Sequence, residues 1–223
     1  MNKDIEYYWV EDAAAGAVKA LEILLETAAA AIAARNRFVL ALSGGSTPGL
    51  LYQMLAKTHQ DWSRWQLIYG DERCLPAEDP ERTSTLVQQS WLNAVSFPPG
   101  NHHKAPAELG SDAAAQAYAT DISALLPVDM ALLGMGEDGH TASLFPGHIH
   151  PELAVVPVHN SPKPPADRIS LSYSTLCEAD TVCLLVIGTA KRDALQRWQQ
   201  GEDLPVARVH GRQKTVLITD TRL

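Results

Sequence analysis

Four short apolar runs in this chain are each followed by a polar loop that contains glycine, and this pattern constrains the fold more than any other feature. The runs cover residues 38–42, 66–69, 130–133 and 182–187. Short, continuous apolar runs are typical of parallel strands that are buried on both faces. Between them lie segments with helical spacing of apolar residues, such as the alanine-rich segment 11–35. Strands that alternate with helices predict an α/β fold with a doubly wound, mostly parallel sheet flanked by helices.

The same patterns predict the remaining elements. Further helices are expected near 47–57, 112–125 and 190–200, and further strands at 154–158, 169–172 and 215–219. The strand at 215–219 is expected to close the sheet, and Thr47 and Pro48 have the residue types of a helix N-cap and a first helical position. Because the chain has no internal repeat and no long linker, residues 1–223 are expected to fold as one domain.

The composition excludes some classes of function. With 46% hydrophobic and 20% charged residues, the chain is typical of a folded globular protein. Its formal net charge of −8 argues against a nucleic-acid partner, which would require a basic face. The charge does not argue against an anionic substrate, since a few cations can dominate one cleft.

Cysteine usage and the absence of long apolar segments indicate a compartment. Cys74, Cys177 and Cys183 have no metal-ligand spacing and leave an odd thiol in any disulfide scheme. The first sixteen residues contain no secretory signal, and no stretch approaches the roughly 20 apolar residues that span a bilayer. We therefore expect a cytoplasmic protein without a membrane partner.

The loop Ser43-Gly44-Gly45-Ser46-Thr47 joins the strand at 38–42 to the next helix. Its glycines allow backbone N–H groups to converge, its hydroxyls add donors, and a helix N-terminus favours negative charge. The loop is expected to bind a phosphate, although a tight turn before a capped helix would have the same composition. It is neither a Walker A loop nor a nucleophile elbow, because it lacks Gly-Lys-Ser/Thr and has Pro48 where the elbow requires glycine.

The segment 129–147 carries the strongest chemical signal. A mostly apolar strand is followed by glycines and by Glu137, Asp138 and His140. Histidine titrates near neutral pH and can accept a proton, and an adjacent carboxylate can fix its tautomer. A lone histidine would more commonly cap a helix or bind loop carbonyls. Here the neighbouring groups and the strand-end position favour a catalytic role for His140.

Two cofactor interpretations are rejected. Residues 134–139 match Gly-x-Gly-x-x-Gly, but a dinucleotide-binding turn must open a helix, and Pro146-Gly147 follows closely. The histidine pairs at 102–103 and at 148 and 150 lie in loops without a carboxylate at ligand spacing, so exposed loop histidines are expected there. No cofactor and no metal are predicted.

Three cations lie beside predicted elements. Arg73 follows the strand at 66–69, within Asp71-Glu72-Arg73, and could bind an anion or a developing oxyanion. Arg168 directly precedes a predicted strand, where a simple edge charge is the alternative. Lys191 lies in the first turn of a helix, where its charge opposes the helix dipole unless an anion binds there as well.

Five motifs are spread along most of the chain: LSGGSTP (42–48), GDERCLP (70–76), GMGEDGHTASLFPG (134–147), RISLS (168–172) and GTAKRDAL (188–195). In this order they resemble the family shared by 6-phosphogluconolactonases and glucosamine-6-phosphate deaminases/isomerases. The sequence at 139–146 and Arg73 follow the lactonase branch, since deaminases typically have GHIAFNEP and an aromatic residue at these places. Thr83-Ser84-Thr85 departs from the Ser-Asn pair of many lactonases, so no substrate contact is assigned there.

The resemblance implies a Rossmann-like α/β fold of the kind seen in those deaminases, a monomer, and a role for each candidate residue. His140 would activate water against a lactone carbonyl, Asp138 would orient it, and Arg73 would face the sugar ring or the carbonyl oxygen. The 6-phosphate would be held by Ser43, Gly44, Gly45, Ser46, Thr47, Arg168 and Lys191.

The activity that the resemblance implies is hydrolysis of 6-phospho-D-glucono-1,5-lactone in the oxidative pentose phosphate pathway, with this small phosphorylated lactone as the partner. An activated δ-lactone requires neither a metal nor a covalent nucleophile. Two alternatives stay open. An amino-sugar phosphate deaminase/isomerase would release ammonia, whereas a sugar-phosphate sensor would bind without turnover, although the chain has no helix-turn-helix segment and no basic face.

Overall fold

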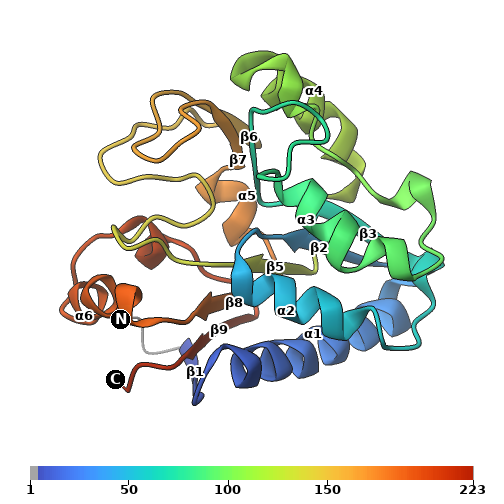
Figure 1. Cartoon of the computed structure of the whole chain (residues 1–223), viewed down its shortest axis with the longest axis horizontal. Helices are drawn as coiled ribbons and strands as arrows, with labels where there is room; N and C mark the ends of the chain where they lie inside the picture. Colours follow the sequence, from blue (N-terminus) through green and yellow to red (C-terminus); the bar gives the residue numbers. More distant parts are fainter. Residues whose placement is uncertain (1–4, 223) are drawn as a thin grey trace.

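The computed structural model describes residues 5–222, in which a six-stranded and a three-stranded sheet lie one above the other (Figure 1). The large sheet contains β1 (Ile5–Trp9), β2 (Phe38–Leu42), β3 (Trp65–Tyr69), β5 (Met130–Leu133), β8 (Thr181–Val186) and β9 (Lys214–Thr219). Its order is β1-β9-β8-β5-β2-β3, and every strand pair in it is parallel. The predicted mostly parallel α/β sheet is confirmed.

Helices flank the sheets. They are α1 (Ala13–Arg35), α2 (Ser46–Leu55), α3 (Thr83–Ser90), α4 (Ser111–Ile122), α5 (Tyr173–Cys177) and α6 (Arg192–Gln199). α1 begins where the Asp12 side chain accepts a hydrogen bond from the Ala15 amide at 2.8 Å, and it packs on β2, β8, β9 and α2. In Figure 1 it lies below the large sheet. None of the helices in the described part of the chain is long and apolar enough to cross a membrane.

The small sheet differs from the prediction. β6 (Val155–Val158) and β7 (Arg168–Leu171) were expected in the parallel sheet, but they pair antiparallel with each other, and β7 pairs with β4 (Asp71–Arg73). Gly70 is where the chain passes between the sheets: its amide donates to the Leu42 carbonyl at 2.8 Å, and its carbonyl accepts from the Leu171 amide at 2.7 Å. The small sheet therefore stands directly beyond the carboxyl ends of β2 and β3.

Two further expectations at element boundaries are wrong. β9 does not close the sheet, because β1 pairs along its outer side. α2 begins at Ser46, with Gly45 at the N-cap and no side-chain cap, so Thr47 is not the N-cap. The reason is the φ of +112° at Gly45, which turns the backbone into the helix earlier than predicted and which other residues rarely adopt.

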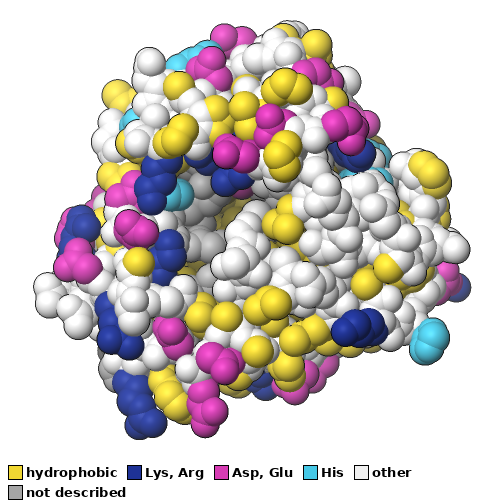
Figure 2. All heavy atoms as spheres, viewed as in Figure 1, with side chains coloured by type: hydrophobic (Ala, Val, Ile, Leu, Met, Phe, Trp, Pro, Cys, Tyr) yellow, Lys and Arg dark blue, Asp and Glu magenta, His cyan; other side chains and the backbone are white. Residues whose placement is uncertain are grey.

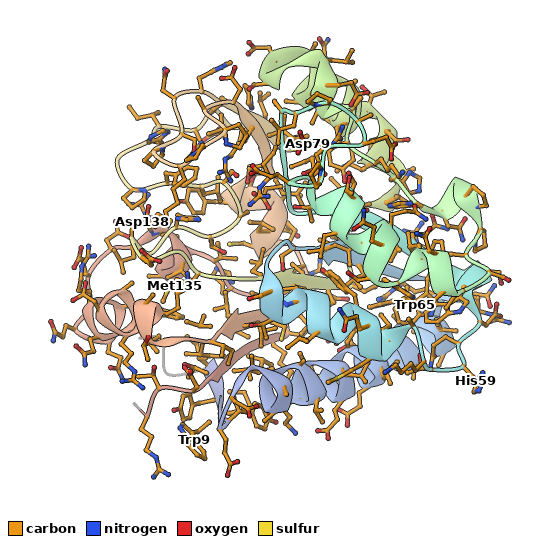
Figure 3. All side chains as sticks on the ribbon, viewed as in Figure 1. Trp9, His59, Trp65, Asp79, Met135 and Asp138 are labelled. Carbon is orange, nitrogen blue, oxygen red and sulfur yellow. The ribbon has the colours of Figure 1, made fainter. Side chains whose placement is uncertain are left out.

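The core is densest at the strands of the large sheet, where β2 and β8 are buried along their whole length. Beside β3, an aromatic cluster includes Trp62, Trp65 and Trp91, with ring centroids of Trp62 and Trp65 5.1 Å apart. Figure 3 shows Trp65 far from Met135 and Asp138, which lie on the loop beyond β5. The packed cluster and the polar loops thus occupy different ends of the sheet.

Candidate active site

A cavity of about 270 Å³ lies between the carboxyl ends of the large sheet and the small sheet. Its walls are Ser43, Gly44, Gly45, Asp71, Arg73, Thr83, Gly134, Met135, Gly136, His140, Ala142, Lys163, Arg168 and Lys191. Figure 2 shows the molecule hollowed in this region, with Lys, Arg and His side chains along the rim of the hollow. Its loops follow β2, β3, β5 and β8, as expected for a ligand site in a parallel α/β sheet.

Most of the residues singled out from the sequence meet in this cavity: Ser43, Gly44, Gly45, Arg73, His140, Arg168 and Lys191. Asp138 lies behind His140 and contacts it directly. Ser46 and Thr47 do not line the cavity, because both belong to the first turn of α2, where Ser46 is exposed and Thr47 is buried. Glu137 is exposed next to the site.

Asp138 and His140 form a hydrogen-bonded pair. Oδ1 of Asp138 lies 2.5 Å from Nδ1 of His140 and also accepts from the His140 amide at 3.2 Å. Burial lowers the pKa of His140, although the Asp138 charge opposes the shift. Burial would raise the pKa of Asp138, but contacts with His140 outweigh it and lower that pKa. An ionised carboxylate only accepts, so the neutral imidazole carries its proton on Nδ1 and leaves Nε2 as a base.

Gly136 makes this pair possible. A β-carbon at Gly136 would lie 2.0 Å from Nδ1 of His140 and 2.6 Å from Oδ1 of Asp138. The Gly136 amide donates to the His140 carbonyl at 2.7 Å, which closes the turn. The glycines of this segment therefore admit the side chains of the pair. They do not form a dinucleotide turn, since the next element after them is the strand β6 and not a helix.

The loop after β2 has the features of an anion site. Ser43 is 6% exposed, and its Oγ has no hydrogen-bond partner among residues 5–222. The buried Tyr52 hydroxyl fixes the backbone of Ser43, donating to its carbonyl at 2.7 Å and accepting from its amide at 3.2 Å. Gly44 and Gly45 lead into the N-terminus of α2, whose dipole favours an anion.

Arg168 is a buried cation rather than an edge charge. Only 5% of it is exposed, and burial lowers its pKa. Its Nη2 donates to the Pro164 carbonyl at 2.8 Å and the Lys163 carbonyl at 3.2 Å, and its Nε donates to the Pro165 carbonyl at 3.2 Å. Arg73 stands directly opposite in the β4–β7 pair, and its Nη1 donates to the Glu81 carbonyl.

Sequence reasoning missed the three other wall residues that have polar side chains: Asp71, Thr83 and Lys163. Asp71 was placed at the edge of the sheet without a role, and its Oδ2 accepts from the Ser143 hydroxyl at 2.6 Å. Lys163 lies in the proline-rich stretch 162–165, to which no role was given from the sequence. A lysine between prolines, five residues before Arg168, was the available signal for a cation held near the site.

Thr83 reaches the cavity because of Glu72, which is fully buried. Oε1 of Glu72 accepts from the amides of Thr83 at 2.8 Å and Arg73 at 2.9 Å, and its Oε2 accepts from the Ser84 amide at 2.9 Å. This carboxylate ties the start of α3 to β4. No local sequence pattern indicates such a contact. The position of Thr83 in the cavity wall was therefore not predicted, and no substrate contact was assigned to it.

The loop histidines are half-buried, not exposed as predicted, because their rings pack on neighbouring side chains. His102 Nε2 lies 2.5 Å from the Tyr69 hydroxyl, and burial lowers the pKa of His102 to about 4. The rings of His148 and His150 stack 6.3 Å apart. Within residues 5–222, no group of three or more His, Cys, Asp or Glu side chains is placed to hold a metal ion.

Comparison with known proteins agrees with this geometry. The model of the family described as glucosamine-6-phosphate isomerases/6-phosphogluconolactonase matches residues 11–218. A 6-phosphogluconolactonase of Mycobacterium leprae is 37% identical over 217 residues, 88% of each chain. One of Streptomyces coelicolor is 37% identical over 90% of this chain and 89% of its own length. A crystal structure of 6-phosphogluconolactonase from Thermotoga maritima, 27% identical, superposes with a TM-score of 0.89 over 96% of this chain and 99% of that one.

Proposed function

Because the chain belongs to the family of glucosamine-6-phosphate isomerases and 6-phosphogluconolactonases, we propose that it hydrolyses 6-phospho-D-glucono-1,5-lactone to 6-phospho-D-gluconate by general-base catalysis. The two relatives from Mycobacterium leprae and Streptomyces coelicolor are 6-phosphogluconolactonases that match over most of their length, and they support this hydrolase reaction of the pentose phosphate pathway. The observation that carries the mechanism is the hydrogen bond between Nδ1 of His140 and Asp138, at a cavity whose walls carry His140 and several cations.

In the first step, Nε2 of His140 takes a proton from water while the water oxygen bonds to C1 of the lactone. The carbonyl π electrons move onto the carbonyl oxygen, which becomes an oxyanion in the tetrahedral intermediate. Asp138 holds Nδ1–H and stabilises the imidazolium that forms. Nearby N–H donors offset the negative charge that develops on the oxygen.

In the second step, the oxyanion electrons re-form the carbonyl and the bond from C1 to the ring oxygen breaks. The ring oxygen takes the proton from the imidazolium, which returns His140 to its neutral state. The product is a carboxylic acid that ionises to 6-phosphogluconate. Each turnover therefore consumes one water and needs no redox partner.

The phosphate supplies orientation. Ser43, Gly44 and Gly45 would bind it with Lys191 and the Nη1 of Arg168, the guanidinium nitrogen with no hydrogen-bond partner in the described structure. Burial lowers the pKa of Lys191 because it disfavours the charged ammonium group. A phosphate bound beside this group would stabilise its positive charge. Binding energy from this remote group positions C1 against the water. Arg73 would face the sugar ring.

The test generates the lactone in situ from glucose 6-phosphate and follows its disappearance with wild type, His140→Ala and His59→Ala. His59 is an exposed histidine that Figure 3 places far from Asp138, so it is a matched control. Rapid loss with wild type and His59→Ala but not with His140→Ala supports the proposal. No acceleration over the spontaneous rate contradicts it, and ammonia release from glucosamine 6-phosphate would then identify a deaminase.

We also infer a cytoplasmic monomer that acts on this small molecule alone. The inference rests on the resemblance and on three cysteines that are all free thiols in the structure. Light scattering of the purified protein tests the monomer: a mass near 24.2 kDa supports it, and a multiple of that mass contradicts it.

A further inference from the structure

Lys163 is a cation in the cavity wall that the mechanism above does not use. Its backbone is held firmly: the Ser161 hydroxyl donates to the Lys163 carbonyl at 2.8 Å and accepts from its amide at 3.3 Å. Arg168 donates to the same carbonyl and to the next one. Prolines flank Lys163 on both sides and restrict the chain further. The half-buried side chain is therefore presented to the cavity from a fixed position.

Lys163 lines the same cavity as His140. The positive charge of Lys163 adds to burial in lowering the pKa of His140, and it acts in the same direction on the pKa of Lys191. The charges that act most on the pKa of Arg168 are instead those of Asp71, which raises it, and Arg73, which lowers it, both on the small sheet. Arg73, the expected partner of the carbonyl oxygen, already donates its Nη1 to the Glu81 carbonyl. Lys163 is thus a cation of this cavity whose charge reaches the imidazole, and its ammonium group has no hydrogen-bond or ion-pair partner in the described structure.

We propose that Lys163 is a catalytic residue that donates a hydrogen bond to the lactone carbonyl oxygen and then to the product carboxylate, with Arg168 as the positioning residue for its loop. The proposal rests on the proposed lactonase function. As the water oxygen bonds to C1 and its proton passes to His140, the carbonyl electron pair moves to the oxygen that faces the ammonium group. Lys163 keeps its own protons throughout and supplies charge where charge develops.

The same ammonium group also favours the neutral, basic form of His140, because a second positive charge in the cavity is unfavourable, whereas Asp138 and Asp71 favour its charged form. Removing the charge from Lys163 should therefore have two separate signatures. The rate falls because the oxyanion loses a donor, and the acidic limb of the pH profile moves to higher pH because the pKa of His140 rises. A merely structural role would not move that limb.

The experiment compares wild type, Lys163→Gln, Lys163→Arg and Lys57→Gln on the phosphorylated lactone and on unphosphorylated D-glucono-1,5-lactone across pH. Lys57 is exposed and outside the site, so it is the matched control. For Lys163→Gln we expect kcat/KM to fall by about 10²- to 10³-fold on both substrates, as for other lost oxyanion donors. Lys163→Arg should keep the wild-type acidic limb and part of the rate.

Two outcomes overturn the proposal. A loss confined to the phosphorylated substrate makes Lys163 a phosphate ligand, and wild-type rates on both substrates give it no role. If wild type itself hydrolyses neither lactone, the proposed function has failed. Titration calorimetry with 6-phosphogluconate measures the affinity for the product carboxylate without turnover. Lys163→Gln should weaken this affinity by about tenfold, whereas the affinity for inorganic phosphate should equal that of wild type. Circular dichroism confirms that each variant is folded.

Discussion

The loops after β2 and β5 leave neighbouring strands at the same edge of the sheet and both are rich in glycine, yet they are built in opposite ways. After β5, glycine at 136 admits two side chains that are bonded to each other before any ligand arrives. After β2, the backbone of Ser43 is clamped by Tyr52 and its hydroxyl is left without a partner in the described structure. One loop is satisfied internally and is suited to proton transfer. The other keeps donors free and is suited to holding an anion.

The largest effect on the rate should come from the loop after β5, which carries His140. His140→Ala should lower kcat by about 10²- to 10⁴-fold with little change in KM, because a general base acts at the chemical step. Since burial lowers the pKa of His140 from 6.5, the wild-type rate should be lost only as the pH falls through a value below 6.5. Steady-state kinetics measures both. An equal loss in kcat and affinity would contradict the division of roles between the loops.

Gly136→Ala tests whether the Asp138–His140 pair requires a residue without a side chain at position 136. Its methyl group would overlap Nδ1 of His140 and displace the imidazole, and a displacement of about 1 Å can cost about 10²-fold in rate. We expect kcat to fall by that order while inorganic phosphate still binds. Gly100→Ala adds the same methyl where no atom lies within 4 Å, so it should behave as wild type. Unchanged kcat in Gly136→Ala would refute the steric argument.

Lys191→Ala should affect the anion side alone. A hydrogen bond to a charged group contributes about 1.5–3 kcal/mol, so KM for the phosphorylated lactone should rise by about 10- to 100-fold. Turnover of unphosphorylated gluconolactone should barely change. A parallel loss on both substrates would show that Lys191 is not a phosphate ligand, and the contrast with Lys163→Gln separates the two ends of the cavity.

The smallest effect is expected at the clamp beneath the anion loop. Tyr52→Phe removes the hydroxyl that fixes Ser43 and should raise KM by about two- to tenfold, in line with about 0.5–1.5 kcal/mol for one neutral hydrogen bond. Tyr7→Phe is a control, because it removes a 2.7 Å bond to the Thr221 carbonyl outside the site. It should alter thermal stability without altering KM. An identical KM in both variants would contradict a positioning role for Tyr52.

The sequence predicts what depends on neighbours along the chain. β2 and β8 were predicted because each is a continuous apolar run, and both are fully buried. His140 was singled out because its partner Asp138 is two residues away. β1 was missed for the opposite reason: an edge strand is only half-buried, and IEYYW shows no apolar run.

Contacts between distant segments could not be predicted. The antiparallel pairing of β4 with β7 joins residues nearly a hundred positions apart, and no periodicity encodes it. Lys163 and Thr83 are held by Arg168 and Glu72, which are close to them in sequence but are themselves positioned by the β4–β7 pairing. The roles given to these and the other site residues, and the prediction of one domain over residues 1–223, stay predictions.

The register of β4 and β7 has a consequence for the stability of the enzyme. Arg73 and Arg168 are direct cross-strand partners, and like charges at such positions repel. If the proposed phosphate dianion binds beside Arg168, it would relieve that repulsion, and ligand binding and folding would then be thermodynamically linked. A ligand present at about 100 times its Kd adds about 2.7 kcal/mol to the free energy of unfolding. Resistance to heat and proteolysis should therefore follow the supply of metabolite, and the protein should be longest-lived when it has substrate to process.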